Sequence, residues 1–386
     1  MTIPPKSTLL PDRMVLENVP RVNFYEGGPR CPEDMCLPSI LRAIIEYRDD
    51  PDYGCNKCLS RTPNCKVPCS YSFFIGVTGA AFFLSWKNGW HGDNTAAFYL
   101  DTDTTMMEKH AFKAIGYSFE LLLPSQRDQF VPRIADSLQR GMPVISYGII
   151  GPPESGLITG YDEGGEVILG WNFFQNFTPG IEKEPSGYYR KRDWVKDVQS
   201  LLIIGEMEAR PPLKTTYREA LELGLKVSRS PMVRPGLDAP ESYQQRHNGL
   251  AAYTAWAEHI QIDEDFLCGD EAVLQQRHQV HNDAVGAVAE ARWYGSQFLI
   301  GMTLSGDELI HRGAIEDLYH AAALYAGEHG LMWELWDLAG GISNPDAWKQ
   351  FADPVVRRKM VPIILEARRK DAEAADHLGQ VLSYSW

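Results

Sequence analysis

The chain has 386 residues, of which 44% are hydrophobic and 23% charged, values that are ordinary for a globular protein long enough to form two domains. Its net charge of −14 disfavours binding to nucleic acid or to anionic membranes, because both partners require a basic face. The N-terminal segment lacks the apolar core of a signal peptide and no stretch of about 18 apolar residues occurs, so we expect a cytoplasmic protein without a membrane span.

The first predicted helix begins at Cys36, and Pro38 supports this start because proline is tolerated in a first helical turn. Apolar residues then recur at helical spacing: Leu37, Ile40, Leu41, Ile44 and Ile45. The positive end of a helix dipole lowers the pKa of a thiol and favours the nucleophilic thiolate. We therefore interpret Cys36 as a candidate nucleophile and Cys31, in the preceding loop, as the reserve. The alternative is that Cys36 is a small buried core residue.

Four cysteines follow within a segment rich in polar and turn-forming residues: Cys55, Cys58, Cys65 and Cys69. Their number and proximity fit the ligands of a tetrahedral structural zinc site. Two disulfides, or four unliganded thiols, are the alternatives that the spacing leaves open. Each of these roles is structural, and no catalytic metal is predicted here. The wholly apolar run at 73–84 is predicted to be buried.

The remainder of this half alternates irregularly between helix and strand signals. Helices are predicted at 105–115 and around 130–138, and strands at 117–123, 143–150, 156–161, 166–171 and 201–204. The segment Asp162-Glu-Gly-Gly165 is a strong hairpin signal between two of these strands. Strands that follow one another without intervening helices favour an α+β fold with a mixed or antiparallel sheet.

Strand signals stop near Pro211 and Pro212, which predicts an N-terminal domain at 15–207 and an all-α domain at 213–386. Helices are expected at 217–227, 250–260, 271–300, 313–329 and 355–382, with a linker at 230–240. His278 and His281 share one helix face, as in metal sites of helical bundles. No Glu-x-x-His partner occurs on a second helix, so a structural role is favoured for this pair.

The helix that begins at Cys36, the segment Gly141-Met-Pro-Val144 and the later Gly160-Tyr-Asp162 together resemble a papain-like thiol fold over about residues 20–205. The chain is most similar in these features to C39-like peptidases and to the butirosin-biosynthesis protein H type of acyltransferase. The resemblance implies a papain-like domain at 15–207 with a cysteine nucleophile.

The resemblance also implies two partners for the nucleophile, and one of them differs here. In these families a histidine base usually stands six residues before the glycine, where this chain has Glu154, and the third position falls at Asn172. A carboxylate can replace imidazole as a base when burial raises its pKa. His91, in a segment rich in Trp and Gly, is an alternative base.

The resemblance implies a thiol-dependent acyltransferase or amide hydrolase that acts on a small-molecule or carrier-protein-bound acyl substrate in secondary metabolism. Because the histidine is absent, the alternative is a catalytically degenerate papain-like fold that binds a small molecule or a partner. A zinc-stabilised interaction module is a third hypothesis. No cofactor other than structural zinc is expected, and the substrate and the oligomeric state stay open.

Overall fold

The computed structural model describes residues 11–25, 32–50, 70–95, 103–233, 246–267, 269–304, 312–341 and 344–384. It divides into two compact units: residues 1–65 with 115–210, and residues 66–114 with 211–386. This division differs from the predicted linear domains 15–207 and 213–386, because the segment 66–114 belongs to the second unit.

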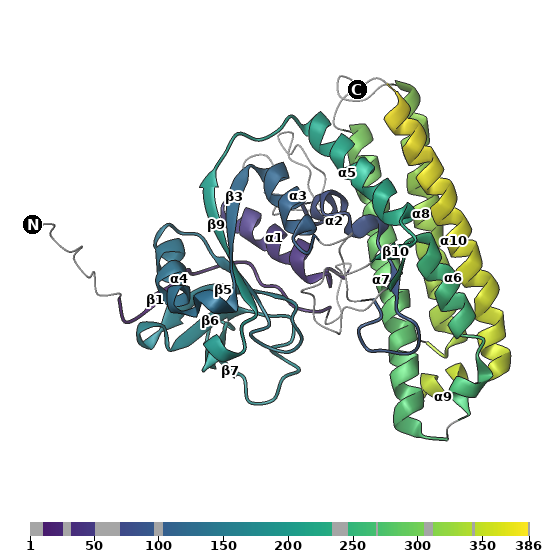
Figure 1. Ribbon diagram of the computed structural model, residues 1–386, viewed down its shortest axis with the longest axis horizontal. Coiled ribbons are helices and arrows are strands. Elements are labelled where there is room, and N and C mark those ends of the chain that lie inside the picture. Colours follow the sequence, from purple (N-terminus) through teal and green to yellow (C-terminus); the bar gives the residue numbers. More distant parts are fainter. Residues whose placement is uncertain are drawn as a thin grey trace, which may run out of the picture. The chain divides into compact units, whose positions relative to one another are not determined.

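The first unit is built on an antiparallel sheet whose strands run in the order β3-β9-β4-β5-β6-β8-β7, with β1 paired to β5 (Figure 1). The predicted α+β class with an antiparallel sheet is confirmed. The strands are β1 (Met14–Val15), β3 (Tyr117–Leu122), β4 (Val144–Tyr147), β5 (Ser155–Asp162), β6 (Val167–Trp171), β7 (Glu182–Lys183), β8 (Tyr189–Arg192) and β9 (Ser200–Met207).

Two α-helices of this unit pack on the sheet: α1 (Cys36–Tyr47) against β5, and α4 (Phe130–Gln139) against β4, β5 and β9. The α1 residues that were predicted to form an apolar stripe are all buried. Arg42 of α1 is buried too, and its guanidinium pairs with Glu33 and Glu46, each at 2.7 Å. Short 3₁₀ turns occupy Pro124–Gln129, Glu163–Gly165 and Trp194–Lys196, the second of which is the predicted hairpin turn.

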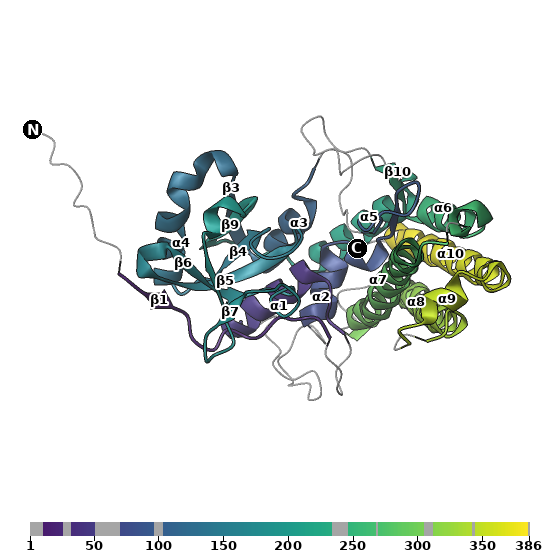
Figure 2. The ribbon, with the colours of Figure 1, turned by 90° about the horizontal axis from the view of Figure 1, so that it is seen from below.

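The second unit is mainly helical. Its α-helices are α2 (Ser70–Val77), α3 (Met106–Ile115), α5 (Leu213–Arg229), α6 (Leu250–His259), α7 (Glu271–Leu304), α8 (Arg312–Leu338), α9 (Ala347–Phe351) and α10 (Pro354–Ser383), with 3₁₀ turns at Ala80–Phe82 and Asp263–Phe266. Helix α8 packs against both α7 and α10, and Figure 2 shows these long helices nearly end-on. The five helices that were predicted after residue 212 are confirmed.

The prediction that this part of the chain is all-helical is wrong in one detail. Strand β11 (Arg246–Asn248) is the middle strand of a small antiparallel sheet, in which it pairs with β10 (Met232–Val233) on one side and with β2 (Ser85–Trp86) on the other. Strands of two or three residues are too short to produce a recognisable alternation in the sequence. The pairing also ties the early segment to the helices, and Trp86 lies fully buried in the helical core beside Trp256.

The early apolar run is buried as predicted, since α2 and the turn at Ala80–Phe82 have no exposed residue. Among the described residues, no helix combines the length and the apolar character needed to cross a membrane.

Candidate functional site

Cys36 is a buried cysteine at the first residue of α1, and the helix begins where the sequence predicted. The residue before the helix, Met35, has extended backbone and supplies no side-chain cap. No acidic residue lies in the first helical turn, so the positive end of the helix dipole is not offset there by a carboxylate of the helix itself. The Cys36 Sγ lies 3.9 Å from the carbonyl oxygen of Asp34.

Two acidic residues precede the helix, and each is engaged. Glu33 pairs with Arg42 at 2.7 Å, and the Asp34 carboxylate accepts a hydrogen bond from the backbone N–H of Tyr25 at 2.7 Å. Burial raises the pKa of the Asp34 carboxyl, an effect that this hydrogen bond opposes. The two acidic side chains just before Cys36 are therefore held by polar contacts, and that of Asp34 is partly desolvated.

The register of β5 and β6 brings Glu154 and Asn172 to the same end of the sheet. Glu154 directly precedes β5, and Asn172 directly follows β6. The two strands are antiparallel with Leu157 opposite Trp171, so the beginning of β5 lies beside the end of β6. Helix α1 packs on β5 as well, which places all three predicted residues on neighbouring elements of one unit.

Glu154 is half-buried, and this burial raises the pKa of its carboxyl because the charged form loses water. Its backbone carbonyl accepts a hydrogen bond from the N–H of Gly148 at 3.3 Å, which closes the loop between β4 and β5. A raised pKa is the property that a carboxylate needs in order to act as a base near neutral pH.

Asn172 is 1% exposed, and its side chain takes part in a turn. Its Oδ1 accepts a hydrogen bond from the N–H of Phe174 at 2.8 Å. The side-chain nitrogen lies over Gly156, where a Cβ would come within 2.8 Å of it. Asn172, the third position that the resemblance implies, is therefore held by a backbone turn, and its side chain requires a glycine on the neighbouring strand.

The structure places His91 in the second unit, whereas Cys36 belongs to the first. The imidazole Nε2 of His91 lies 3.0 Å from the carbonyl oxygen of Asn88, to which it donates its hydrogen. Cys31 and the four predicted zinc ligands, Cys55, Cys58, Cys65 and Cys69, lie outside the described residues. Within the described ranges, no three side chains of His, Cys, Asp or Glu are grouped as metal ligands would be.

A hollow of about 320 Å³ in the first unit was not predicted from the sequence. It is lined by the loop between β4 and β5, the segment after β6, β8 and the segment before β9: Gly148, Ile149, Ile150, Gly151, Pro153, Thr178, Ile181, Lys191, Asp197 and Gln199. Gly148 and Gly151 have φ values of 81° and 74°, which favour glycine and shape the loop. This pair of glycines was the only signal in the sequence.

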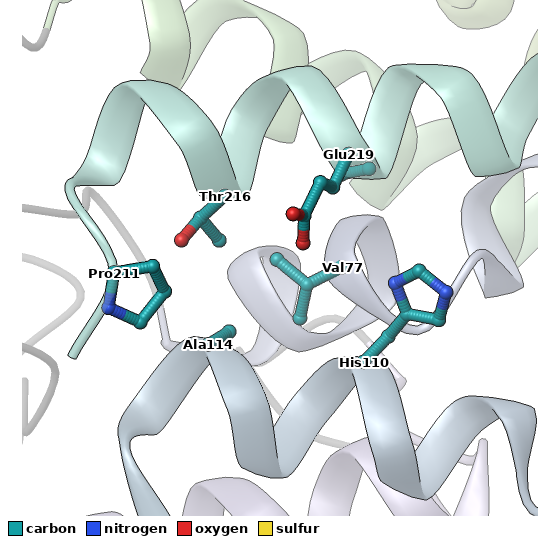
Figure 3. Close-up of a pocket in the computed structure, with 7 residues that line it drawn as sticks. Val77, His110, Ala114, Pro211, Thr216 and Glu219 are labelled. Carbon is teal, nitrogen blue, oxygen red and sulfur yellow. The ribbon is translucent and has the colours of Figure 1, made fainter. Parts of the chain in front are cut away.

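A much smaller hollow, of about 10 Å³, lies between α3 and α5 in the second unit. Figure 3 shows Thr216 and Glu219 of α5 near His110 and Ala114 of α3. The buried Thr216 hydroxyl has no hydrogen-bond partner among the described residues, and burial lowers the pKa of the His110 imidazole. The volume suits one water molecule, so we interpret this hollow as structural.

A buried charge cluster in the second unit was also not predicted from the sequence. Arg292, Glu328 and Asp371 are 0% exposed, and they come from α7, α8 and α10. The Arg292 guanidinium donates to Asp371 at 3.0 Å and to the carbonyl oxygen of Ala81 at 2.7 Å, and the Tyr253 hydroxyl donates to Glu328. The feature of the sequence that could have indicated this cluster is the occurrence of charged residues on otherwise apolar helix faces.

The His278 and His281 pair agrees with the structural interpretation. His281 is 0% exposed, and its Nδ1 accepts a hydrogen bond from the indole N–H of Trp256 at 3.3 Å. Burial, with a smaller contribution from His278, lowers the pKa of His281 to about 3, so this imidazole is neutral in the folded protein.

A comparison of the chain with family models found no match, and neither did a comparison with curated protein sequences. The interpretation of the site therefore depends on the packing of the elements that carry Cys36, Glu154 and Asn172.

Proposed function

We propose that this protein is a thiol-dependent acyltransferase or amide hydrolase with a papain-like N-terminal unit. The observation that carries the proposal is the placement of Cys36 at the first residue of α1, on a helix that packs against the strand that begins directly after Glu154. Cys36 would attack the carbonyl carbon of a thioester or amide while the thiol proton passes to a base. The bond to the leaving thiol or amine would then break, with that proton returned to the leaving group, and water or an acceptor nucleophile would release the acyl group from Cys36.

Glu154 is the proposed base, because burial raises the pKa of its carboxyl toward the range in which it can take and return a proton. Asn172, fixed by its turn, is proposed to position the groups at this end of the sheet. Backbone N–H groups at the start of α1 would stabilise the oxyanion that forms on the substrate. The resemblance supports a small-molecule or carrier-protein-bound acyl group as substrate.

The test is catalysed acyl transfer from a short acyl thioester of N-acetylcysteamine to hydroxylamine or water. We expect Cys36→Ser to lower the rate at least about a hundredfold, since it removes the nucleophile. Glu154→Gln should lower the rate by about a hundredfold as well, which is the usual effect of losing a general base. Glu206→Gln is the matched control, because that side chain is 87% exposed. A rate in the wild type that equals the rate in Cys36→Ser would refute the proposal.

A second candidate is a binding protein on the same fold, in which Cys36 has no chemical role. The substitution of Glu154 for the histidine that the resemblance implies favours it, and so does the hollow of about 320 Å³. The structural zinc site at the four cysteines stays a prediction from the sequence.

A further inference from the structure

We propose that the hollow lined by residues 148–151 binds a small organic anion with an apolar body and a carboxylate or phosphate end. The inference does not depend on the chemistry of Cys36. Its volume of about 320 Å³ is within the range of small-molecule sites.

Two backbone N–H groups in the lining of the hollow support an anionic ligand. Ile149 and Ile150 line the hollow and are each 2% exposed, yet their N–H groups make no hydrogen bond with any described residue. The preceding N–H, that of Gly148, is used by the carbonyl oxygen of Glu154. Buried backbone donors are rarely left without an acceptor, because an unmade hydrogen bond in a desolvated place costs free energy. An acceptor inside the hollow would satisfy both.

Charge provides the second argument. Lys191 of β8 lines the same hollow, and its ammonium lies 2.9 Å from the carboxylate of Asp197. An ammonium has three donors, so it can hold Asp197 and a second acceptor together. A cationic ligand would be repelled by the Lys191 ammonium and the two N–H groups, and the one carboxylate of the described lining, that of Asp197, is already paired with Lys191. The donors therefore select an anion.

Apolar surface defines the rest of the ligand. Pro153, which is exposed, and Ile181, which is half-buried, share the lining with the polar groups. Inorganic phosphate would leave this surface uncovered, whereas a short alkyl chain would remove it from water. The complementary ligand thus has an anionic end at Lys191 and an apolar body.

Calorimetric titration with four hexyl probes and inorganic phosphate tests the proposal. We expect hexanoate or hexyl phosphate to bind at least about tenfold more tightly than hexanol and hexylamine, because an ion pair with Lys191 adds to the shared alkyl contact. The anionic hexyl probe that binds should also bind more tightly than inorganic phosphate. Equal affinities for hexanoate and hexylamine, no binding of either anion, or phosphate binding as tight as that of hexyl phosphate would overturn the proposal.

Variants connect this binding to the residues. Lys191→Met should weaken binding of the anion at least about tenfold, while Asp197→Asn should strengthen it by removing the competing carboxylate. Lys196→Met is the matched control, since its side chain is 68% exposed and does not line the hollow. Cys36→Ser should bind as the wild type does, which separates this proposal from the catalytic one. Unchanged affinity in both Lys191→Met and Asp197→Asn would also overturn it.

Discussion

At the scale of single residues, the second unit contains one buried cation between two buried carboxylates. Arg292 contacts Asp371 at 3.0 Å and Glu328 at 3.5 Å, and all three side chains are 0% exposed. One guanidinium cannot compensate two carboxylates in a desolvated site, so one of them binds a proton. Burial raises the pKa of Glu328 to about 8, and that of Asp371 is raised as well.

This protonation makes the stability of the fold depend on pH. Between the ordinary carboxyl pKa of 4.5 and about 8, the folded chain holds a proton on Glu328 that the unfolded chain has lost. The free energy of unfolding therefore falls as pH rises through this window, by up to about 1.4 kcal/mol per pH unit from this group. We expect Glu328→Gln to flatten the decline in urea unfolding between pH 5.5 and 8.

Glu366→Gln is the control for this prediction. Hydrogen bonding to Arg369 lowers the pKa of Glu366, so the loss of that carboxyl should not flatten the decline. Identical pH dependence in the wild type and in Glu328→Gln would show that the carboxyl is ionised in the folded protein.

The same residues show what a sequence can and cannot indicate at this scale. Glu154 and Asn172 could be placed near one end of a sheet, because strand boundaries follow from local alternation and a hairpin signal. Arg292 and Glu328 lie on separate helices, 36 positions apart, and their meeting depends on tertiary packing. No local pattern in the sequence contains that information.

At the scale of elements, close helix packing is set by glycine positions. Gly76 of α2 lies against Phe298 of α7, and a Cβ at residue 76 would come within 2.4 Å of the aromatic ring. Phe298 is 3% exposed and so has little room to move. Gly330 of α8, by contrast, has open space at an added Cβ as far as the described residues go, apart from the backbone of its own helix.

The two glycines should respond to alanine with opposite signs. Gly76→Ala is expected to destabilise the fold by about 1–3 kcal/mol, because the core would be overpacked. Gly330→Ala should stabilise it by up to about 1 kcal/mol, because alanine is the better helix former and meets no obstacle. Urea unfolding of the two variants at one pH measures both effects, and the same sign for both would contradict the packing of α2 on α7.

Helices and strands were predicted correctly where their sequence pattern was long. Helices α5, α7, α8 and α10 were each expected from apolar periodicity, and the hairpin of β5 and β6 from its turn. The small sheet of β2, β10 and β11 was missed, because each strand is too short for periodicity and the partners are far apart in the chain.

At the scale of the whole molecule, two separate segments of the chain form the second unit. Residues 66–114 interrupt the first unit and supply Leu84 and Trp86 to the core that is otherwise formed by the helices after residue 211. The sequence indicated that residues 73–84 are buried, but an apolar run does not specify the partner against which it packs. The linear division at 207 therefore places this segment with the N-terminal half, whereas the structure groups it with the second unit.

The reactivity of Cys36 at pH 6 tests the catalytic claim most directly. The rate of iodoacetamide labelling at this residue, followed by peptide mass, should be compared between the folded protein and the same protein unfolded in urea. If the start of α1 activates the thiol, folded Cys36 will react at least about threefold faster, since a greater thiolate fraction outweighs the lower nucleophilicity of a thiol with a lower pKa. If folded Cys36 reacts more slowly than the unfolded residue, the thiol is a core side chain and the claim of acyl chemistry at this site is contradicted.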